Sequence, residues 1–404
     1  MPRPLQGLRI IELSSFIAAP LGGMTLAQLG ADVIRIEPPD GGADRRRWPI
    51  TSSGHSLYWA GLNKGKRSVA IDQRTAQGRD LIARLITAPA TGGGIVLTNA
   101  AAPVGLRYED LVSLRCDLIY VGITGFPDGR TAVDYTVNAS VGFAGVTGPE
   151  GHPLPVNHVL PAWDVACGLY AATGLLAAER ARTMTGDSQR LSISLHDVAL
   201  ATAGNLGFLA EAEVNQVTRP RIGDAVYGTY GHTFETRDGQ RIMVVTLTQR
   251  QWRDLVRITD TQAEVDVLEQ RLGVTFDNAA ARYTSRHSLD RLFEPWFAGN
   301  TQDIAAKQLS RTAVVWSRVR SFAQVVDDQL GTGSEPILST IEQPGVGRHL
   351  AANGPIAIDG QLPPAVPAPQ LGQHTDEVLR ELLDLSEQQT RSLRRAGAIP
   401  ALSA

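Results

Sequence analysis

Residues 9–36 read RIIELSSFIAAPLGGMTLAQLGADVIRI, and this stretch decides the fold. Its two ends, Arg9–Leu13 and Asp32–Ile36, are short apolar runs that are typical of buried strands. Between them, Leu21–Leu29 spaces its apolar residues as a helix does, and Gly30 is a good C-terminal stop. A strand, a helix and a second strand form a β-α-β unit, and such units predict a parallel sheet.

The same alternation continues downstream. Ser68–Ile71, Gly94–Thr98 and Cys116–Ile123 have the composition of strands, and Ala76–Ile86 has helical spacing. An open parallel sheet binds ligands beyond the carboxyl ends of its strands. We therefore expect the chemistry in the loops at 14–20, 37–48, 63–67, 99–106 and 124–134.

Changes in composition and in predicted secondary structure along the chain predict the domain organisation. Residues 1–215 are expected to form a large Rossmann-like domain, and 216–232, rich in Gly, Pro and Tyr, a linker or lid. Residues 233–328 form a smaller α+β domain that begins with a hairpin, since Asp238-Gly239 is a tight-turn signal. The segment 329–404 returns to the large domain. The predicted fold class is α/β with a parallel sheet.

Composition excludes several classes of protein. A net charge of −3 and a pI near 6.3 argue against a nucleic-acid partner. No apolar stretch reaches the roughly 20 residues that span a bilayer, so no membrane partner is expected. Cys116 and Cys167 lie in no metal-binding pattern, so no metal is predicted. Met1–Leu5 lacks the apolar core of a signal peptide, which predicts a cytoplasmic protein.

Asp164 lies in the first turn of a long apolar helix that Pro161 opens and that runs to about Arg182. In the simpler interpretation its charge complements the helix dipole. In the alternative, backbone N–H groups at the helix start keep the carboxylate ionised, as a nucleophile requires. The sequence around Asp164 leaves both interpretations open.

The basic run Asn63-Lys64-Gly65-Lys66-Arg67 is either a solvated turn or a clamp for phosphates. Arg45–Arg47 is a similar run with the same two interpretations. Ser14–Gly23 lacks the glycine spacing of a dinucleotide fingerprint, and Gly22-Gly23 is expected to allow close packing. No Gly-x-Ser-x-Gly elbow occurs. These residues indicate an α/β enzyme with a phosphorylated ligand.

Four further segments, taken in order, resemble the class III CoA-transferase family. They are Gly7–Leu13, Leu29–Pro38, Asn63–Ala70 and Ala368–Thr375. The resemblance spans nearly the whole chain. It implies an acyl-CoA substrate, no cofactor beyond the CoA moiety, and an interlocked homodimer.

The resemblance also implies roles for individual residues. Asp164 matches the aspartate that becomes covalently acylated in transferases of this family. Two departures, Pro38 after Glu37 and Ala100 after Asn99, remove expected CoA contacts, so phosphate binding falls to the basic loops. The residues expected to bind CoA are Phe16, Ile17, Ala18, Lys64, Lys66, Arg67 and Asn99.

The racemase branch of the family places a histidine immediately before an aspartate, and here that pair is Val133-Asp134. This difference favours transfer over racemisation. The chain is most similar to the branch that moves CoA between the two carboxyl groups of one dicarboxylic acid. Transfer between two acids is the alternative within the family. From other classes, a nucleotide-binding oxidoreductase and a non-catalytic CoA-binding protein remain. The residues expected to hold the freed acid are Arg219, Arg221, Tyr227 and Tyr230.

Overall fold

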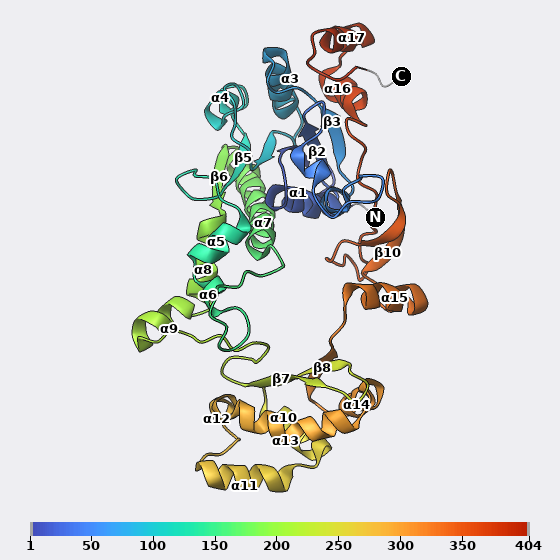
Figure 1. Cartoon of the computed structure of the whole chain (residues 1–404). Helices are drawn as coiled ribbons and strands as arrows, with labels where there is room; N and C mark the ends of the chain where they lie inside the picture. The colour runs from blue at the N-terminus through green and yellow to red at the C-terminus, as the bar shows by residue number, and fades with distance from the viewer. Residues whose placement is uncertain (1–2, 402–404) are drawn as a thin grey trace. The chain divides into compact units, whose positions relative to one another are not determined.

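The computed structural model describes residues 3–401, so Met1, Pro2 and 402–404 of the expected domains lie outside it. Its contacts divide the chain into two compact units (Figure 1). Unit 1 comprises Met1–Val141, His158–Gln216 and Ser334–Ala404, and unit 2 comprises Gly142–Asn157 and Val217–Gly333. The C-terminal segment, red in Figure 1, thus belongs with the N-terminal sheet. Gly142–Asn157 groups with unit 2, whereas the sequence assigned it to the large domain.

Unit 1 is built on a six-stranded sheet in the order β3-β2-β1-β4-β5-β6, and every neighbouring pair is parallel. This confirms the α/β class. The order reverses between β1 and β4, which places the topological switch point of a doubly wound fold at their carboxyl ends. The strands are β1 (Arg9–Leu13), β2 (Asp32–Glu37), β3 (Arg67–Ala70), β4 (Ile95–Thr98), β5 (Ile119–Thr124) and β6 (Gln189–Ser194).

The long helix predicted from Pro161 is confirmed as α7 (Ala162–Thr185), which ends at Gly186 in the left-handed conformation with φ 77°. The sequence also predicts a single helix from about Val198 to about Val214, and this prediction is wrong, because Gly207, with φ 79°, divides it into α8 (Leu195–Asn205) and α9 (Phe208–Asn215). The other elements of unit 1 are α1 (Ala18–Gln28), η1 (Ala43–Arg46), α2 (Leu57–Leu62), α3 (Ala76–Thr87), α4 (Tyr108–Val112), α5 (Asp134–Ser140), β10 (Leu338–Gln343), β11 (Gly347–Ala352), α16 (Thr375–Leu383) and α17 (Glu387–Arg395).

Helices α1 and α7 approach each other closely through glycines. A Cβ atom on Gly22 would lie 2.8 Å from the carbonyl oxygen of Gly168, and one on Gly168 would lie 2.5 Å from that of Ala18. Real side chains do not tolerate such distances, so both positions require glycine. The predicted packing role of Gly22 is confirmed. Gly23 makes room for the carboxylate of Glu12 instead.

Unit 2 pairs a three-stranded antiparallel sheet, in the order β7-β8-β9, with helices that cover an aromatic core. The predicted hairpin is confirmed, and Gly239 adopts the left-handed conformation that its turn requires. No helix in residues 3–401 is long and apolar enough to cross a bilayer. The elements are α6 (Phe143–Val146), β7 (Tyr230–Glu235), β8 (Arg241–Thr246), α10 (Gln249–Thr259), α11 (Gln262–Leu272), α12 (Ala279–Thr284), α13 (Arg286–Gly299), α14 (Gln302–Leu309), β9 (Val315–Arg318) and α15 (Phe322–Thr332).

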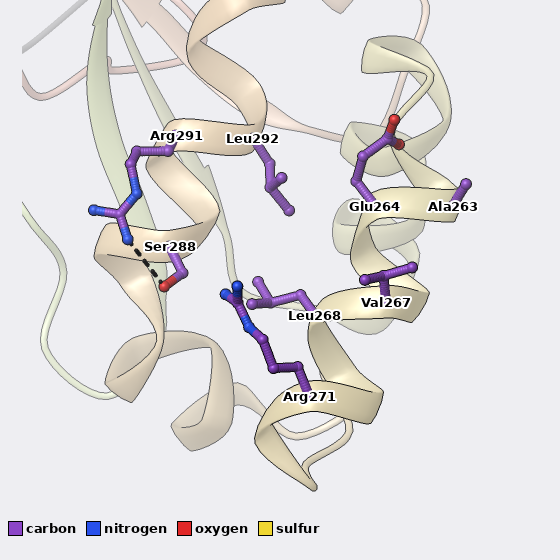
Figure 2. Close-up of a pocket in the computed structure, with 8 residues that line it drawn as sticks. All are labelled: Ala263, Glu264, Val267, Leu268, Arg271, Ser288, Arg291 and Leu292. Carbon is purple, nitrogen blue, oxygen red and sulfur yellow. Dashed lines mark hydrogen bonds between the residues drawn. The ribbon is translucent and has the colours of Figure 1, made fainter.

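An open hollow of about 450 Å³ lies between α11 and α13, and Figure 2 shows the side chains that line it. Leu268 and Leu292 form its apolar part, and Arg291 donates to the Ser288 hydroxyl. None of the residues that the sequence singled out as site residues lines this hollow.

Candidate active site

The loop that joins β1 to α1 lies at the switch point, and Asn99 after β4 holds it. The amide of Asn99 accepts from the backbone N–H of Ser15 at 2.9 Å and donates to its carbonyl at 2.7 Å. Phe16 adopts φ 63°, and its N–H donates to Asp44. Helix α1 begins after Ile17 with no side-chain cap. Uncapped N–H groups at a helix start can bind an anion, and Ile17 and Ala18 stand at such a start.

Two buried cations, Lys66 and Arg35, hold this loop through hydrogen bonds from the core. Lys66 donates to Glu12 at 2.8 Å, to the carbonyl oxygen of Pro20 at 2.9 Å and to Asn63 at 2.9 Å. An ammonium has three donors, so none is left for a ligand phosphate. Burial, opposed by the charge of Glu12, lowers the pKa of Lys66 to about 8. Lys66 therefore supports the start of α1 from within the core.

Arg35 is the second buried cation of this network. It donates to Asp44 at 2.6 Å and to Asn63 at 2.8 Å, and it is almost fully buried. Asp44 in turn accepts the N–H of Phe16, so the network fixes the strained residue of the loop.

Arg67 lies at the amino ends of the strands, on the side of the sheet opposite the switch point. It is the first residue of β3 and pairs with Asp32 at the start of β2, and it also reaches Glu377 and Glu381 on α16. The structure does not bring it to the carboxyl ends of the strands. It ties the C-terminal helix to the sheet.

Lys64 differs from both of these cations. Its side chain is buried, and it has no hydrogen bond or ion pair among residues 3–401. Burial lowers its pKa. An unpaired ammonium in such a place is costly unless an anion joins it. In the other basic run, Arg45 binds Glu37 through two 2.7 Å hydrogen bonds and stacks on Trp59, while Arg46 and Arg47 are exposed.

The start of α7 is capped by a residue thirty positions away. Asp134 accepts from the backbone N–H groups of Trp163 at 2.6 Å and Asp164 at 3.1 Å, and it is almost fully buried. The expectation that these N–H groups hold the Asp164 carboxylate is therefore wrong. The sequence drew attention to Asp134 only because no histidine precedes it. Its role as the cap of α7 was missed, because a cap supplied from about thirty residues away leaves no local sequence pattern.

The carboxylate of Asp164 stands alone. It is half-buried, and no group in the described part of the chain donates a hydrogen bond to it. Burial, and then the negative charge of Asp134, raise its pKa to about 7. A carboxylate with so little stabilisation of its charge is unusually basic, and strongly shifted groups mark candidate catalytic sites.

Two neighbours of Asp164, Tyr58 and Cys167, remain neutral at pH 7. Burial, with a smaller contribution from the charge of Asp164, raises the pKa of Tyr58 and of Cys167 to about 12. Cys167 is therefore a thiol and not a competing thiolate. Tyr58 keeps its O–H and can donate a hydrogen bond.

The close packing of α1 and α7 joins these two features into one site. Gly168 lies one turn after Asp164 and contacts the carbonyl of Ala18, the first residue of α1. The Asp164 carboxylate and the uncapped start of α1 therefore lie on two closely packed helices.

The residues expected to hold the freed acid all lie in unit 2. Arg221 donates to the carbonyl oxygens of Gly145, His152 and Leu154. Tyr230 is fully buried and donates to Asp290 at 2.8 Å. Both side chains therefore have structural partners. Arg219 stacks on the ring of Tyr227 at 4.0 Å, and Tyr227 is partly exposed.

Comparisons with known proteins identify the family of the chain. The sequence pattern of CoA-transferase family III matches residues 5–375. The chain is 46% identical to 2-methylfumaryl-CoA isomerase of Chloroflexus aurantiacus, over 98% of this chain and 97% of that protein. It is 30% identical to succinate–glutarate CoA-transferase of Agrobacterium fabrum, over 94% and 96%.

A solved structure agrees with the fold. A CaiB/BaiF family protein from Brucella suis superposes with a TM-score of 0.77 at 27% identity, covering 95% of this chain and all of the other. The alternative of a nucleotide-binding oxidoreductase is set aside, because the family pattern spans both units. The chain belongs to CoA-transferase family III.

Proposed function

We propose that the protein is an isomerase that transfers CoA within one molecule, converting 2-methylfumaryl-CoA to 3-methylfumaryl-CoA. Asp164 is the nucleophile. The observation that carries the proposal is the isolated Asp164 carboxylate, with its pKa raised to about 7, on the helix that packs against the switch-point loop. The 46% identity to a 2-methylfumaryl-CoA isomerase supports the substrate.

The first exchange puts CoA on the enzyme. A carboxylate oxygen of Asp164 attacks the thioester carbonyl, the C–S bond breaks, and CoA leaves as thiolate. The thiolate then attacks the aspartyl carbonyl of the mixed anhydride. This forms an aspartyl-CoA thioester and releases mesaconate as a carboxylate. Covalent catalysis divides one difficult transfer into easier exchanges.

The second exchange returns CoA to the other end of the acid. Mesaconate stays bound, and its second carboxylate attacks the aspartyl thioester. The same steps run in reverse, form 3-methylfumaryl-CoA and restore the Asp164 carboxylate. Retention keeps the freed acid at high effective concentration, which makes the transfer intramolecular. The steps draw only on carboxylate, thioester and thiolate, so we propose no cofactor beyond CoA itself.

We propose that the CoA phosphates bind at the switch point. Phe16, Ile17 and Ala18 offer backbone groups at the uncapped start of α1, and Asn99 holds that loop in place. Lys64 offers an unpaired cation. The Tyr58 hydroxyl is our candidate donor to the freed acid in unit 1. Arg219 and Tyr227 lie in unit 2, and their role in holding that acid stays a prediction from the sequence.

We also propose a homodimer that works in the cytoplasm. Helix α9 buries none of its residues, and apolar side chains on neighbouring helices of unit 1 are exposed as well. Clustered exposed apolar residues are costly in a monomer and support association. Both cysteines are free, which suits a reducing compartment. The exposed side chains are Leu169, Tyr170, Leu200, Leu206, Leu209 and Val214.

The decisive assay uses purified protein, 2-methylfumaryl-CoA and isotopically labelled free mesaconate. We expect 3-methylfumaryl-CoA to form without added acid, and the label to stay out of the thioester pool. An absolute requirement for a free acid, with label entering the product, would point instead to transfer between two acids. The activity in the name of the 30% identical relative gives that alternative its support.

A further inference from the structure

His158 is a group that the proposed transfer steps do not use. It lies on the segment before α7, and its Nε2 contacts Oδ1 of Asp134 at 2.5 Å. The histidine side chain is 21% exposed, and that of Asp134 is only 2% exposed. The imidazole therefore covers a buried carboxylate from the solvent side.

Asp134 connects this histidine to the nucleophile. Its Oδ1 faces His158, while its Oδ2 accepts the backbone N–H groups of Trp163 and Asp164. One carboxylate thus joins an imidazole to the backbone of Asp164. Burial is the main reason that the pKa of Asp164 is raised, and the negative charge of Asp134 raises it further.

The start of α7 has a second anchor on α5 that does not involve His158. The indole N–H of Trp163 donates to Asn138 at 3.1 Å, one turn along α5 from Asp134. The Trp163 and Tyr135 rings lie 6.0 Å and 6.1 Å from the imidazole. The helix start is therefore held by Asp134 and Asn138 together, so the loss of His158 removes a hydrogen bond without removing the cap.

We propose that His158 is a positioning residue of the transfer reaction, which acts through Asp134 to set the charge and direction of the Asp164 carboxylate. The inference rests on the proposed function and deepens it. A hydrogen bond from His158 draws negative charge on Asp134 away from Asp164, and its loss increases the repulsion between the two carboxylates.

Few other charged or titratable groups face this pair. Tyr58 on α2 and Cys167 on α7 respond to the charge of Asp164 and stay neutral. Arg47 interacts with Tyr58, at 5.9 Å from its ring, and so acts on Asp164 at one remove. Asp134 is the anion whose charge bears directly on Asp164.

The test titrates Asp164 directly. Aspartate labelled with ¹³C at the side-chain carboxyl gives one resonance that disappears in Asp164→Asn, and its midpoint is followed in each variant. We expect His158→Ala to raise the midpoint by about half a pH unit or more, and Asp134→Asn to lower it by about one unit or more. His158→Gln retains an N–H donor, so we expect it to return the midpoint toward the wild-type value.

Turnover provides a second, independent readout. We expect His158→Ala to lower kcat about twofold or more at pH 7 with little change in KM, because fewer Asp164 carboxylates are ionised. His196→Ala is the matched control, since His196 contacts Asp197 at 3.5 Å at the start of α8 and should change neither readout.

Two outcomes would overturn the proposal: a midpoint in His158→Ala equal to that of the wild type, or shifts of the same sign in His158→Ala and Asp134→Asn. If His158→Ala does not fold, His158→Gln and Asp134→Asn still decide between these outcomes by the sign and size of their shifts. The titration needs no substrate. A wild-type protein without isomerase activity would therefore contradict the proposed function and leave the titration result readable.

Discussion

Asp164 in unit 1 and Asp290 in unit 2 both have a raised pKa, but they differ in the groups that surround them. Burial is the main reason that the pKa of each lies above its ordinary value. Asp290 accepts a hydrogen bond from Tyr230 at 2.8 Å, and His232 and His287 lie 3.9 Å and 3.8 Å from its other oxygen. Asp164 has no such donor in residues 3–401, and the charge that acts on it is that of another carboxylate, Asp134.

The difference shows what separates a structural carboxylate from a reactive one. Burial makes each charge expensive. Donors then offset the cost at Asp290, whose role is to hold Tyr230 and the sheet of unit 2 to α13. At Asp164 no donor offsets the free-energy cost of the buried charge. The carboxylate is therefore unusually basic, as a strong nucleophile must be.

The largest expected effect separates the two residues by activity. Asp164→Asn should lower kcat roughly 10⁴-fold or more, as removal of a covalent nucleophile does. Asp290→Asn should leave the reaction chemistry intact and lower stability instead, by about 1–3 kcal/mol, because it weakens a buried hydrogen-bonded group. Isomerisation rates and thermal melting of both variants check this. Equal losses of activity in the two variants would contradict the distinction.

The second effect tests how Asp164 is placed. Gly168→Val would set a side chain against the carbonyl of Ala18, where even a Cβ atom would lie at 2.5 Å. The start of α7 must then move from α1, and a displacement of about 1 Å costs about 10²-fold in rate. Gly174→Ala on the same helix is the control, because its Cβ would meet only the flexible side chain of Leu191. A Gly168→Val enzyme with normal kcat would show that this contact does not position the site.

The third effect is pH dependence. Since the pKa of Asp164 is about 7, we expect kcat to fall about tenfold per pH unit below that value, as the carboxylate becomes protonated. The folded state retains a proton that the unfolded state loses above an ordinary pKa of 3.8. This group therefore lowers stability progressively as pH rises from about 4 to 7. Asp164→Asn should remove that slope in a series of melts. A flat rate profile from pH 5 to 8 would argue against the raised pKa.

The smallest effect concerns the donor to Asp290. Tyr230→Phe removes one hydroxyl from a fully buried ring and should lower stability by about 1–2 kcal/mol, because Asp290 loses its donor. Tyr135→Phe, on an exposed ring of α5, should change it by less than about 0.5 kcal/mol. Urea denaturation measures both. If the two variants lose equal stability, Asp290 does not depend on its donor.

Much of the fold follows from local pattern. The strands from Arg9 to Thr98, the helix that begins after Pro161 and ends at Gly186, and the hairpin with its Asp238-Gly239 turn all occur near their expected places. Each signal acts within a few residues: apolar spacing, a cap or a turn. Gly207 was missed because a glycine within an otherwise helical pattern is often tolerated.

The basic loop shows a feature that local sequence pattern does not predict, namely where neighbouring side chains lie in the folded chain. Lys64, Lys66 and Arg67 form one cluster in the sequence, yet the structure sends them to three places. Lys66 binds Glu12 in the core, Arg67 binds Asp32 at the amino ends of the strands, and Lys64 stays unpaired. Neighbouring residues at a strand start point to opposite faces, so proximity in sequence does not make a common site.

The sequence by itself determined the parallel sheet, the long helix that carries Asp164, and the family. Periodicity and short-range signals encode such features. Only the tertiary structure decided that the N–H groups at the start of α7 belong to Asp134, that His158 stands behind it, and that Asp164 is left without a donor. The pKa of Asp164 depends on burial and on a charge thirty residues away, and both exist only after the chain has folded.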